Sequence, residues 1–130
     1  MAMVWPAFVA RRKRVTRRQW TSDYAESIRA AERMQVWDRS PRFGGQKIGE
    51  LQVIIAPYRQ PIAEMPDQDY EAEGLYFLDD HPGLVPAHYQ IDFRRWRRSG
   101  GVYWVVPFEI TSVERSAMIR LNALIDATRA

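Results

Sequence analysis

The chain has 130 residues, which is the size of one domain and too few for two well-formed hydrophobic cores. It contains no cysteine, which excludes disulfides, thiolate chemistry and cysteine-based zinc sites, and no apolar run reaches the roughly 18–20 residues of a membrane span. Its first apolar stretch precedes a basic run, the reverse of the order in a secretory signal. We therefore expect a single cytoplasmic domain, with its core at about residues 8–109 and no membrane partner.

Positive charge is distributed unevenly along the chain. The formal net charge is only +3, yet six of the 19 basic residues lie in residues 11–18 and four in residues 93–98. Seven of the 16 acids lie between Glu64 and Asp80. This distribution predicts a two-faced molecule with an anion-attracting side. Two solvated basic surfaces without a partner are the alternative.

In the first half of the chain, residues 4–10 are expected to form a short helix that ends at the basic run. Residues 34–37 alternate in polarity and predict a short strand, and the β-branched, apolar residues 48–56 predict a buried strand. An acidic helix is expected at residues 67–75, with Asp67 as its N-cap and Gly74 as its stop.

In the second half, residues 79–88 are expected to form a loop and residues 89–96 a helix. Residues 102–108 (VYWVVPF) give the strongest strand signal, and Pro107 is expected to place this strand at an edge or to end it. Thr111 and Glu114 resemble a capping box for a C-terminal helix at about residues 112–127. Short strands with helices between them predict an α+β fold, a small mixed, partly open β-barrel with flanking helices.

Three patterns occur in order along the chain. They are residues 12–20 (RKRVTRRQW), 69–74 (DYEAEG) and 102–109 (VYWVVPFE). Together they resemble the ASCH family of PUA-like β-barrel domains, in which a K-T-x-T-R-R segment comes early, an acidic helix ends in E-G and the last core strand ends in F-E. The resemblance covers about residues 8–109. The chain departs from this pattern at Arg11 and Arg14, where the family usually has glycine and threonine.

The ASCH resemblance implies RNA binding or RNA metabolism. Some members are small amidohydrolases that remove the acetyl group from acetylated cytidine, and ribonuclease activity is reported for others. The lysine, threonine and glutamate that such amidohydrolases use fall on Lys13, Thr16 and Glu73 of this chain. The resemblance thus gives three candidate catalytic residues.

These three residue types also suit such chemistry on physical grounds. A threonine hydroxyl is a weak nucleophile until a base takes its proton, and a lysine among arginines is pushed toward neutrality by like charge. Glu73 could then orient Lys13 or accept a proton. Alternatively, Lys13 and Glu73 form an ordinary ion pair and the Thr16 hydroxyl belongs to a turn.

Arginines in the two basic clusters are candidates for phosphate contacts with RNA. In residues 93–98 (FRRWRR) they alternate with aromatics, a composition that grips single-stranded nucleic acid by base stacking and phosphate contacts. The three-residue spacing of Phe93 and Trp96 favours instead a helix whose aromatics face the core. The candidate nucleic-acid-binding residues are Arg11, Arg12, Arg14, Arg17, Arg18, Arg94, Arg95, Arg97 and Arg98.

No metal site or cofactor is expected. His81 and His88 are seven residues apart without a paired histidine or cysteine spacing, and the alternating acids of residues 67–73 lack the calcium-loop pattern. Three functions remain open: an RNA- or nucleotide-binding module, a small hydrolase using the same cleft, and a protein–protein adaptor whose basic face meets an acidic partner.

Overall fold

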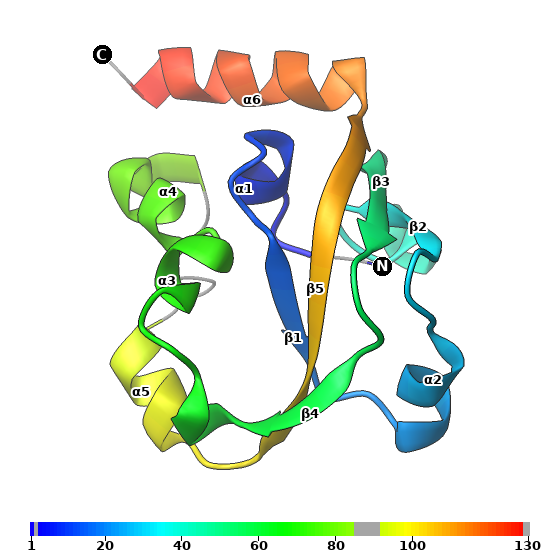
Figure 1. The fold of residues 1–130 in the computed structure, drawn as a ribbon. Helices are drawn as coiled ribbons and strands as arrows, with labels where there is room; N and C mark the ends of the chain where they lie inside the picture. Colours follow the sequence, from blue (N-terminus) through cyan, green and yellow to red (C-terminus); the bar gives the residue numbers. More distant parts are fainter. Residues whose placement is uncertain (2, 85–91, 129–130) are drawn as a thin grey trace.

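The computed structural model describes residues 1, 3–84 and 92–128, and it has an open β-sheet flanked by short helices (Figure 1). The strands are β1 (Val15–Arg18), β2 (Arg33–Trp37), β3 (Lys47–Val53), β4 (Tyr58–Pro61) and β5 (Val102–Val113). The α-helices are α1 (Trp5–Val9), α2 (Ser22–Ser27), α3 (Asp69–Ala72), α4 (Leu75–Asp80), α5 (Phe93–Arg98) and α6 (Arg115–Thr128). Single 3-10 turns lie at Pro41–Phe43, Ile62–Glu64 and Pro82–Leu84.

The long strand β5 organises the sheet. β1 and β4 both pair with its first half, on opposite edges, and β3 pairs with its second half and also with β2. This arrangement confirms the predicted α+β class and the open sheet. All four pairings described are antiparallel, in place of the mixture of parallel and antiparallel pairs that was expected.

Pro107 lies inside β5, where β1 pairs with one edge of that strand and the other edge faces the break between β3 and β4. Its carbonyl accepts a hydrogen bond from the Ile54 amide at 3.0 Å. Since the nitrogen and carbonyl of one strand residue point to the same edge, the proline nitrogen faces the break between β3 and β4, where no donor is required. Pro107 therefore does not end the strand, but its nitrogen does lie on a locally unpaired edge, as expected.

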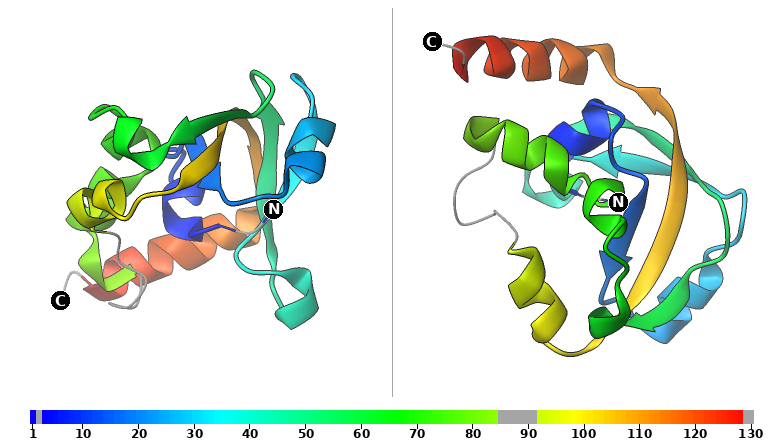
Figure 2. Two further views of the ribbon diagram at one scale, coloured as in Figure 1. Left: turned by 90° about the horizontal axis from the view of Figure 1, so that it is seen from below. Right: turned by 60° about the vertical axis from the view of Figure 1, so that its left-hand side comes forward.

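The hydrophobic core lies between the sheet and helices from both ends of the chain. Phe8 of α1 and Phe108 of β5 are almost completely buried, with ring centroids 6.2 Å apart. Ala117 and Leu121 of α6 join the same cluster, and Figure 2 shows α6 lying across the end of the molecule beside α1 and α4. Helices α1 and α6, from opposite ends of the chain, thus pack into the same hydrophobic cluster.

Several local expectations need correction. The basic run contains strand β1. Gly74 ends the acidic helix α3 as expected, but a second helix, α4, follows it directly. Thr111 lies within β5, so it caps no helix, and α6 begins at Arg115. Part of the expected loop and helix at residues 79–96, including His88 and Tyr89, lies outside the described residues. Within the described ranges, the helices are too short or too polar to cross a membrane.

Candidate functional site

A tight turn after α1 brings the basic segment into the sheet. Arg11 adopts a left-handed conformation (φ 60°), and the amides of Arg12 and Lys13 both donate to the carbonyl of Ala7, at 2.9 and 3.2 Å. The chain then enters β1, where Thr16 lies opposite Val106 of β5. Lys13 and Thr16 therefore have fixed backbones, one held by helix α1 and the other by the sheet.

Gly74 brings Glu73 against this segment. Its φ of +84° is left-handed, and a Cβ atom built on it would lie 2.4 Å from Cβ of Ala7. Only glycine combines that conformation with so close an approach. The junction between α3 and α4 consequently packs directly on α1, with Glu73 at the contact. A backbone hydrogen bond of 2.7 Å from the Arg14 amide to the carbonyl of Ala72 reinforces it.

Four charged side chains meet at this junction, and we call them the buried charge network: Lys13, Arg17, Asp69 and Glu73. Lys13 Nζ donates to Oε1 of Glu73 at 3.0 Å and to the Glu73 carbonyl at 3.1 Å. Arg17 donates to Oε2 of Glu73 at 3.2 Å and also pairs with Asp69. Gln60 of β4 accepts a further bond from Arg17 at 3.0 Å. Glu73 thereby holds two cations at once.

Burial of these charged groups costs hydration free energy. The side chains of Lys13, Arg17 and Glu73 are only 10%, 1% and 4% exposed. Ions removed from water each lose several kcal/mol of hydration, and a buried pair often adds no net stability over apolar residues of the same volume. Charge retained at such cost is typical of functional sites, although structural networks also occur.

A cavity of about 250 Å³ adjoins the network. Its polar lining is formed by Lys13, Thr16, Arg17, Arg18 and Glu73, and its apolar lining by Met3, Val4, Ala7, Leu75, Leu78 and Trp96. Arg18 Nε donates to the Thr16 hydroxyl at 3.2 Å. Burial lowers the pKa of the Arg18 guanidinium, and the negative charge of Glu73 opposes that shift. The hydroxyl of Thr16 thus lies beside a desolvated cation.

The three candidate catalytic residues all line this one cavity, although Glu73 is 60 residues from Lys13 in the sequence. Their contacts differ from a base–nucleophile pair, however. The structure places the Lys13 amine against Glu73 and the Thr16 hydroxyl against Arg18. The expectation that Lys13 is surrounded by like charge also needs correction, because its direct partner is a carboxylate.

The remaining candidate arginines fall into three groups. Arg17 lies inside the network and Arg18 lines the cavity, whereas Arg12 pairs with Glu71 and Arg97 with Asp67. The others are exposed on the loop before β1 and on α5: Arg11, Arg14, Arg94, Arg95 and Arg98. They are the side chains of this set that the structure presents to an external phosphate.

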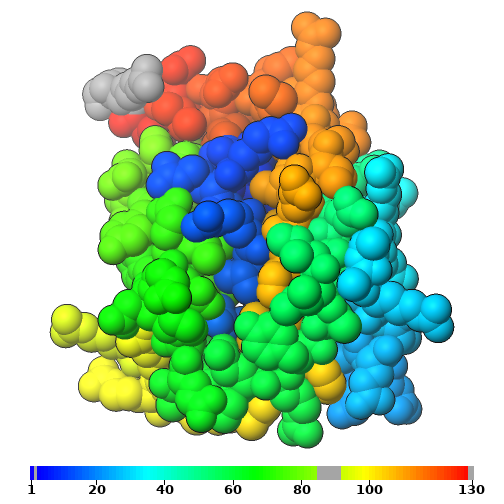
Figure 3. All heavy atoms as spheres, in the orientation of Figure 1, coloured from blue at the N-terminus to red at the C-terminus, as the bar shows by residue number. Residues whose placement is uncertain are grey.

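The acidic stretch lies against the two basic clusters. Asp67, Asp69, Glu71 and Glu73 each pair with a residue of a basic cluster. Figure 3 shows the N-terminal segment (blue) in the middle of one face, between the green segment that carries α3 and α4 and the orange strand β5. The acidic stretch therefore neutralises much of the positive charge that the sequence had suggested was available to a partner.

Three site residues were missed: Gln60, Asp69 as a partner of Arg17, and Trp96 as part of the cavity lining. Gln60 lies in β4, a strand that no hydrophobic pattern in the sequence predicted. The aromatic spacing of α5 placed Trp96 against the core, yet it is half-buried and reaches the cavity. The mixture of aromatic residues and arginines in residues 93–98, which suggested base stacking, was the signal that could have identified Trp96 as a site residue.

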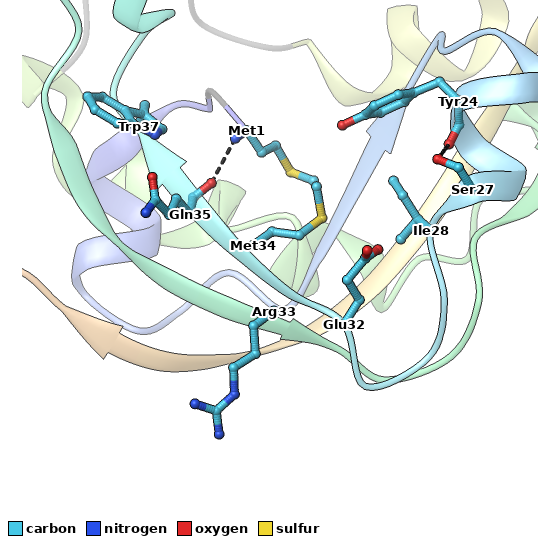
Figure 4. Close-up of a pocket in the computed structure, with 9 residues that line it drawn as sticks. All are labelled: Met1, Tyr24, Ser27, Ile28, Glu32, Arg33, Met34, Gln35 and Trp37. Carbon is cyan, nitrogen blue, oxygen red and sulfur yellow. Dashed lines mark hydrogen bonds between the residues drawn. The ribbon is translucent and has the colours of Figure 1, made fainter.

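A second cavity, of about 420 Å³, lies between α2 and β2 (Figure 4). Met1, Tyr24, Glu32 and Met34 line it together with five neighbours, and the terminal amine of Met1 donates to the carbonyl of Gln35 at 2.7 Å. None of the candidate residues lies there. In the part of the chain that the structure describes, no three His, Cys, Asp or Glu side chains gather in a way that could hold a metal ion.

The fold and site together define a small α+β domain with an open antiparallel sheet and a cavity beside buried ion pairs. No family model and no curated protein matches the chain. Among solved structures, protein EF3133 of Enterococcus faecalis V583, from the DUF984 family, is similar over 82% of this chain and 69% of its own. The TM-score is 0.50 and the identity 16%, so the similarity concerns the fold alone. The ASCH resemblance stays a prediction.

Proposed function

We propose that this chain is an ASCH-like domain that binds RNA or a nucleotide, with its ligand in the cavity beside the buried charge network. The observation that carries this proposal is the meeting of Lys13, Thr16 and Glu73 around one cavity. The sequence resemblance selected these residues without reference to their position in space. Their convergence at a site with costly buried charge supports a ligand-binding role.

Exposed arginines on α5 and in the loop before β1 support RNA as the partner. Arg94, Arg95 and Arg98 lie on α5, the helix that contributes Trp96 to the cavity lining, and Arg14 lies just before β1. Arginine pairs well with phosphate, and such contacts position a strand without selecting its sequence. The cavity would then select a group of the strand, and the arginines would hold its backbone.

The proposal is tested by binding of a short single-stranded RNA, measured by fluorescence anisotropy at several salt concentrations. Thr16→Val removes one cavity hydroxyl at nearly constant volume, and Thr111→Val makes the same change at an exposed position of β5. We expect salt-sensitive binding by the wild type, about two- to tenfold weaker binding by Thr16→Val, and no change in Thr111→Val. Absence of binding by the wild type, or equal binding by both variants, contradicts the proposal.

A small hydrolase acting in the same cavity is the second candidate. The observation that favours it is the placement of a lysine, a threonine and a glutamate in one cavity lining. Catalysis requires Lys13 to turn from Glu73 toward Thr16 when substrate binds, because the two side chains have other partners in the structure. The wild type should then hydrolyse acetylated cytidine or cleave RNA. Binding without turnover leaves the binding module as the function.

A further inference from the structure

One edge of strand β2 is paired over only part of its length in the described chain. β3 pairs with the other edge, and a bond of 2.9 Å from the Val53 amide to the Glu32 carbonyl shows that Glu32 faces β3. Because backbone groups alternate between the two edges along a strand, Arg33 and Gln35 face the opposite edge. Within the described residues, the Gln35 amide and both backbone groups of Arg33 have no hydrogen-bond partner there. We call this edge, at residues 33–35, the free edge of β2.

Further along, the same edge already pairs with a neighbouring segment of the chain. The Trp37 amide donates to the carbonyl of Met1 at 2.7 Å, and the Met3 amide donates to the Trp37 carbonyl at 3.1 Å. The Met1 amine donates to the Gln35 carbonyl at 2.7 Å. These bonds show that groups on this edge are accessible to the backbone of another segment. Unpaired donors and acceptors that continue such a row are a template for a further extended chain.

The second cavity lies along the free edge (Figure 4). Four of the five residues of β2 line it, together with Tyr24, Ser27 and Ile28 from α2 and its C-terminal end. Met34 projects to the same side of the sheet as Val36, which is completely buried in the core. A chain added beside β2 would therefore place every second side chain next to Met34, inside the cavity.

The charged groups around this cavity favour a basic occupant. Figure 4 shows the Arg33 side chain pointing away from the cavity and the Glu32 carboxylate pointing into it. The Met1 amine is turned toward the Gln35 carbonyl, and burial lowers its pKa, so its positive charge is weakened. Oε2 of Glu32 accepts a bond from the Arg29 amide at 3.3 Å, and Oε1 has no partner within the described residues. Glu32 is therefore the charged group that an occupant of the cavity would meet.

We propose that the free edge of β2 binds an extended peptide segment of a partner protein, with a lysine or arginine side chain in the second cavity. The peptide backbone pairs with Arg33 and Gln35. The aliphatic part of the basic side chain lies against the thioethers of Met1 and Met34, and its charged end meets Glu32. No residue lines both this cavity and the one proposed for RNA, so the inference goes beyond the proposed function and does not depend on it.

The experiment titrates ¹⁵N-labelled protein with an acetylated and amidated peptide, Thr-Val-Thr-Lys-Thr-Val-Thr, and with the same peptide carrying glutamate in place of lysine. Gln35→Pro removes the outward amide, and the strand tolerates proline there because that amide has no bond within the fold. Gln35→Val is its control, since it changes the same side chain but keeps the amide. Glu32→Gln removes the charge in the cavity, and Glu26→Gln makes the same change on α2 outside it. Melting temperatures show whether each variant is folded.

We expect the wild type to bind the lysine peptide more tightly than the glutamate peptide, and the bound peptide to slow hydrogen exchange at the Gln35 amide. Affinity for the lysine peptide should fall about two- to tenfold in Gln35→Pro, the range for one hydrogen bond. It should fall about two- to fivefold in Glu32→Gln, the range for one partly exposed ion pair. Gln35→Val and Glu26→Gln should bind like the wild type.

Several results would overturn the inference. One is the absence of binding by the wild type, and another is binding that leaves hydrogen exchange at the Gln35 amide unchanged, a reading that needs no variant. Equal affinities of the lysine and glutamate peptides would exclude a basic side chain in the cavity. Sedimentation velocity distinguishes a different occupant, because a dimer that Gln35→Pro abolishes would show that a second copy of this chain covers the edge.

Discussion

Nζ of Lys13 lies 3.0 Å from Oε1 of Glu73, and both side chains are almost completely removed from solvent. The contact joins the loop before β1 to the junction between α3 and α4. Because Glu73 also holds Arg17, one carboxylate fixes two cations and defines one wall of the cavity. The stability of the domain and the shape of its candidate site therefore depend on the same side chain.

Replacing Glu73 with alanine should destabilise the fold strongly. The change leaves Lys13 without its carboxylate partner and weakens the hold on Arg17, and breaking a buried ion pair in this way costs about 3–5 kcal/mol. Urea denaturation measures the free energy of unfolding. Glu71→Ala is the control two residues away, where the partner that is removed belongs to the exposed Arg12, and it should have little effect. Similar destabilisation in the two variants would show that the buried ion pairs of Glu73 contribute no more to the free energy of unfolding than the exposed pair of Glu71.

Alanine at Gly74 should destabilise the domain more than alanine at Gly100. Both glycines have left-handed φ angles, +84° and +76°, so both changes introduce backbone strain of about 1–3 kcal/mol. Only at position 74 does the new Cβ also meet another atom, Cβ of Ala7 at 2.4 Å, whereas position 100 has open space. The melting temperature should therefore fall further for Gly74→Ala. Equal melting temperatures would contradict the close packing of the α3–α4 junction on α1.

Removing two arginines from α5 should weaken RNA binding through its electrostatic component. Arg94 and Arg95 are exposed, so the double alanine variant should remain folded while binding phosphate less well. The slope of log affinity against log salt should fall by about 0.7 for each phosphate of single-stranded RNA that the variant no longer neutralises. A double alanine variant at Arg33 and Arg42, which are exposed on β2 and the first 3-10 turn, makes the same change in charge. If the affinities of both variants fall equally, α5 has no specific role.

Lys13→Arg separates binding from catalysis. Arginine keeps the positive charge but cannot give up its proton at accessible pH. If Lys13 is a general base, turnover of acetylated cytidine should fall by about 10²–10⁴-fold in this variant. Nucleoside affinity measured on the same protein shows whether the larger side chain still leaves the cavity intact. Undiminished turnover would remove Lys13 from the chemistry.

The sequence predicted those elements whose stability is local or hydrophobic. The β-branched run at residues 48–56 and the run at residues 102–108 were identified as strands because their pattern is independent of distant partners. Helix α1 and the C-terminal helix were found within a few residues for similar reasons. The α+β class follows from these elements, although the pairing directions do not.

Strand β1 and the charge network could not be predicted in the same way. Thr16 and Arg17 are polar residues in a fully buried part of a strand, which no hydrophobic pattern signals. Arg17 is tolerated there because Gln60, Asp69 and Glu73, which lie 43–56 residues further along the chain, supply its acceptors. Tertiary contacts of this kind convert an apparent solvent-facing basic run into part of the interior.

The central claim is that the cavity between β1 and α4 is the site at which an RNA or nucleotide binds, and nuclear magnetic resonance tests it most directly. A short single-stranded RNA is added to ¹⁵N-labelled wild-type protein, and the amide and indole chemical shifts are followed. The account predicts the largest changes at the amides of Thr16, Glu73 and Gly74 and at the indole of Trp96, with Met34 of the second cavity unaffected. Changes confined to the second cavity, or no change at any of these groups, would contradict it.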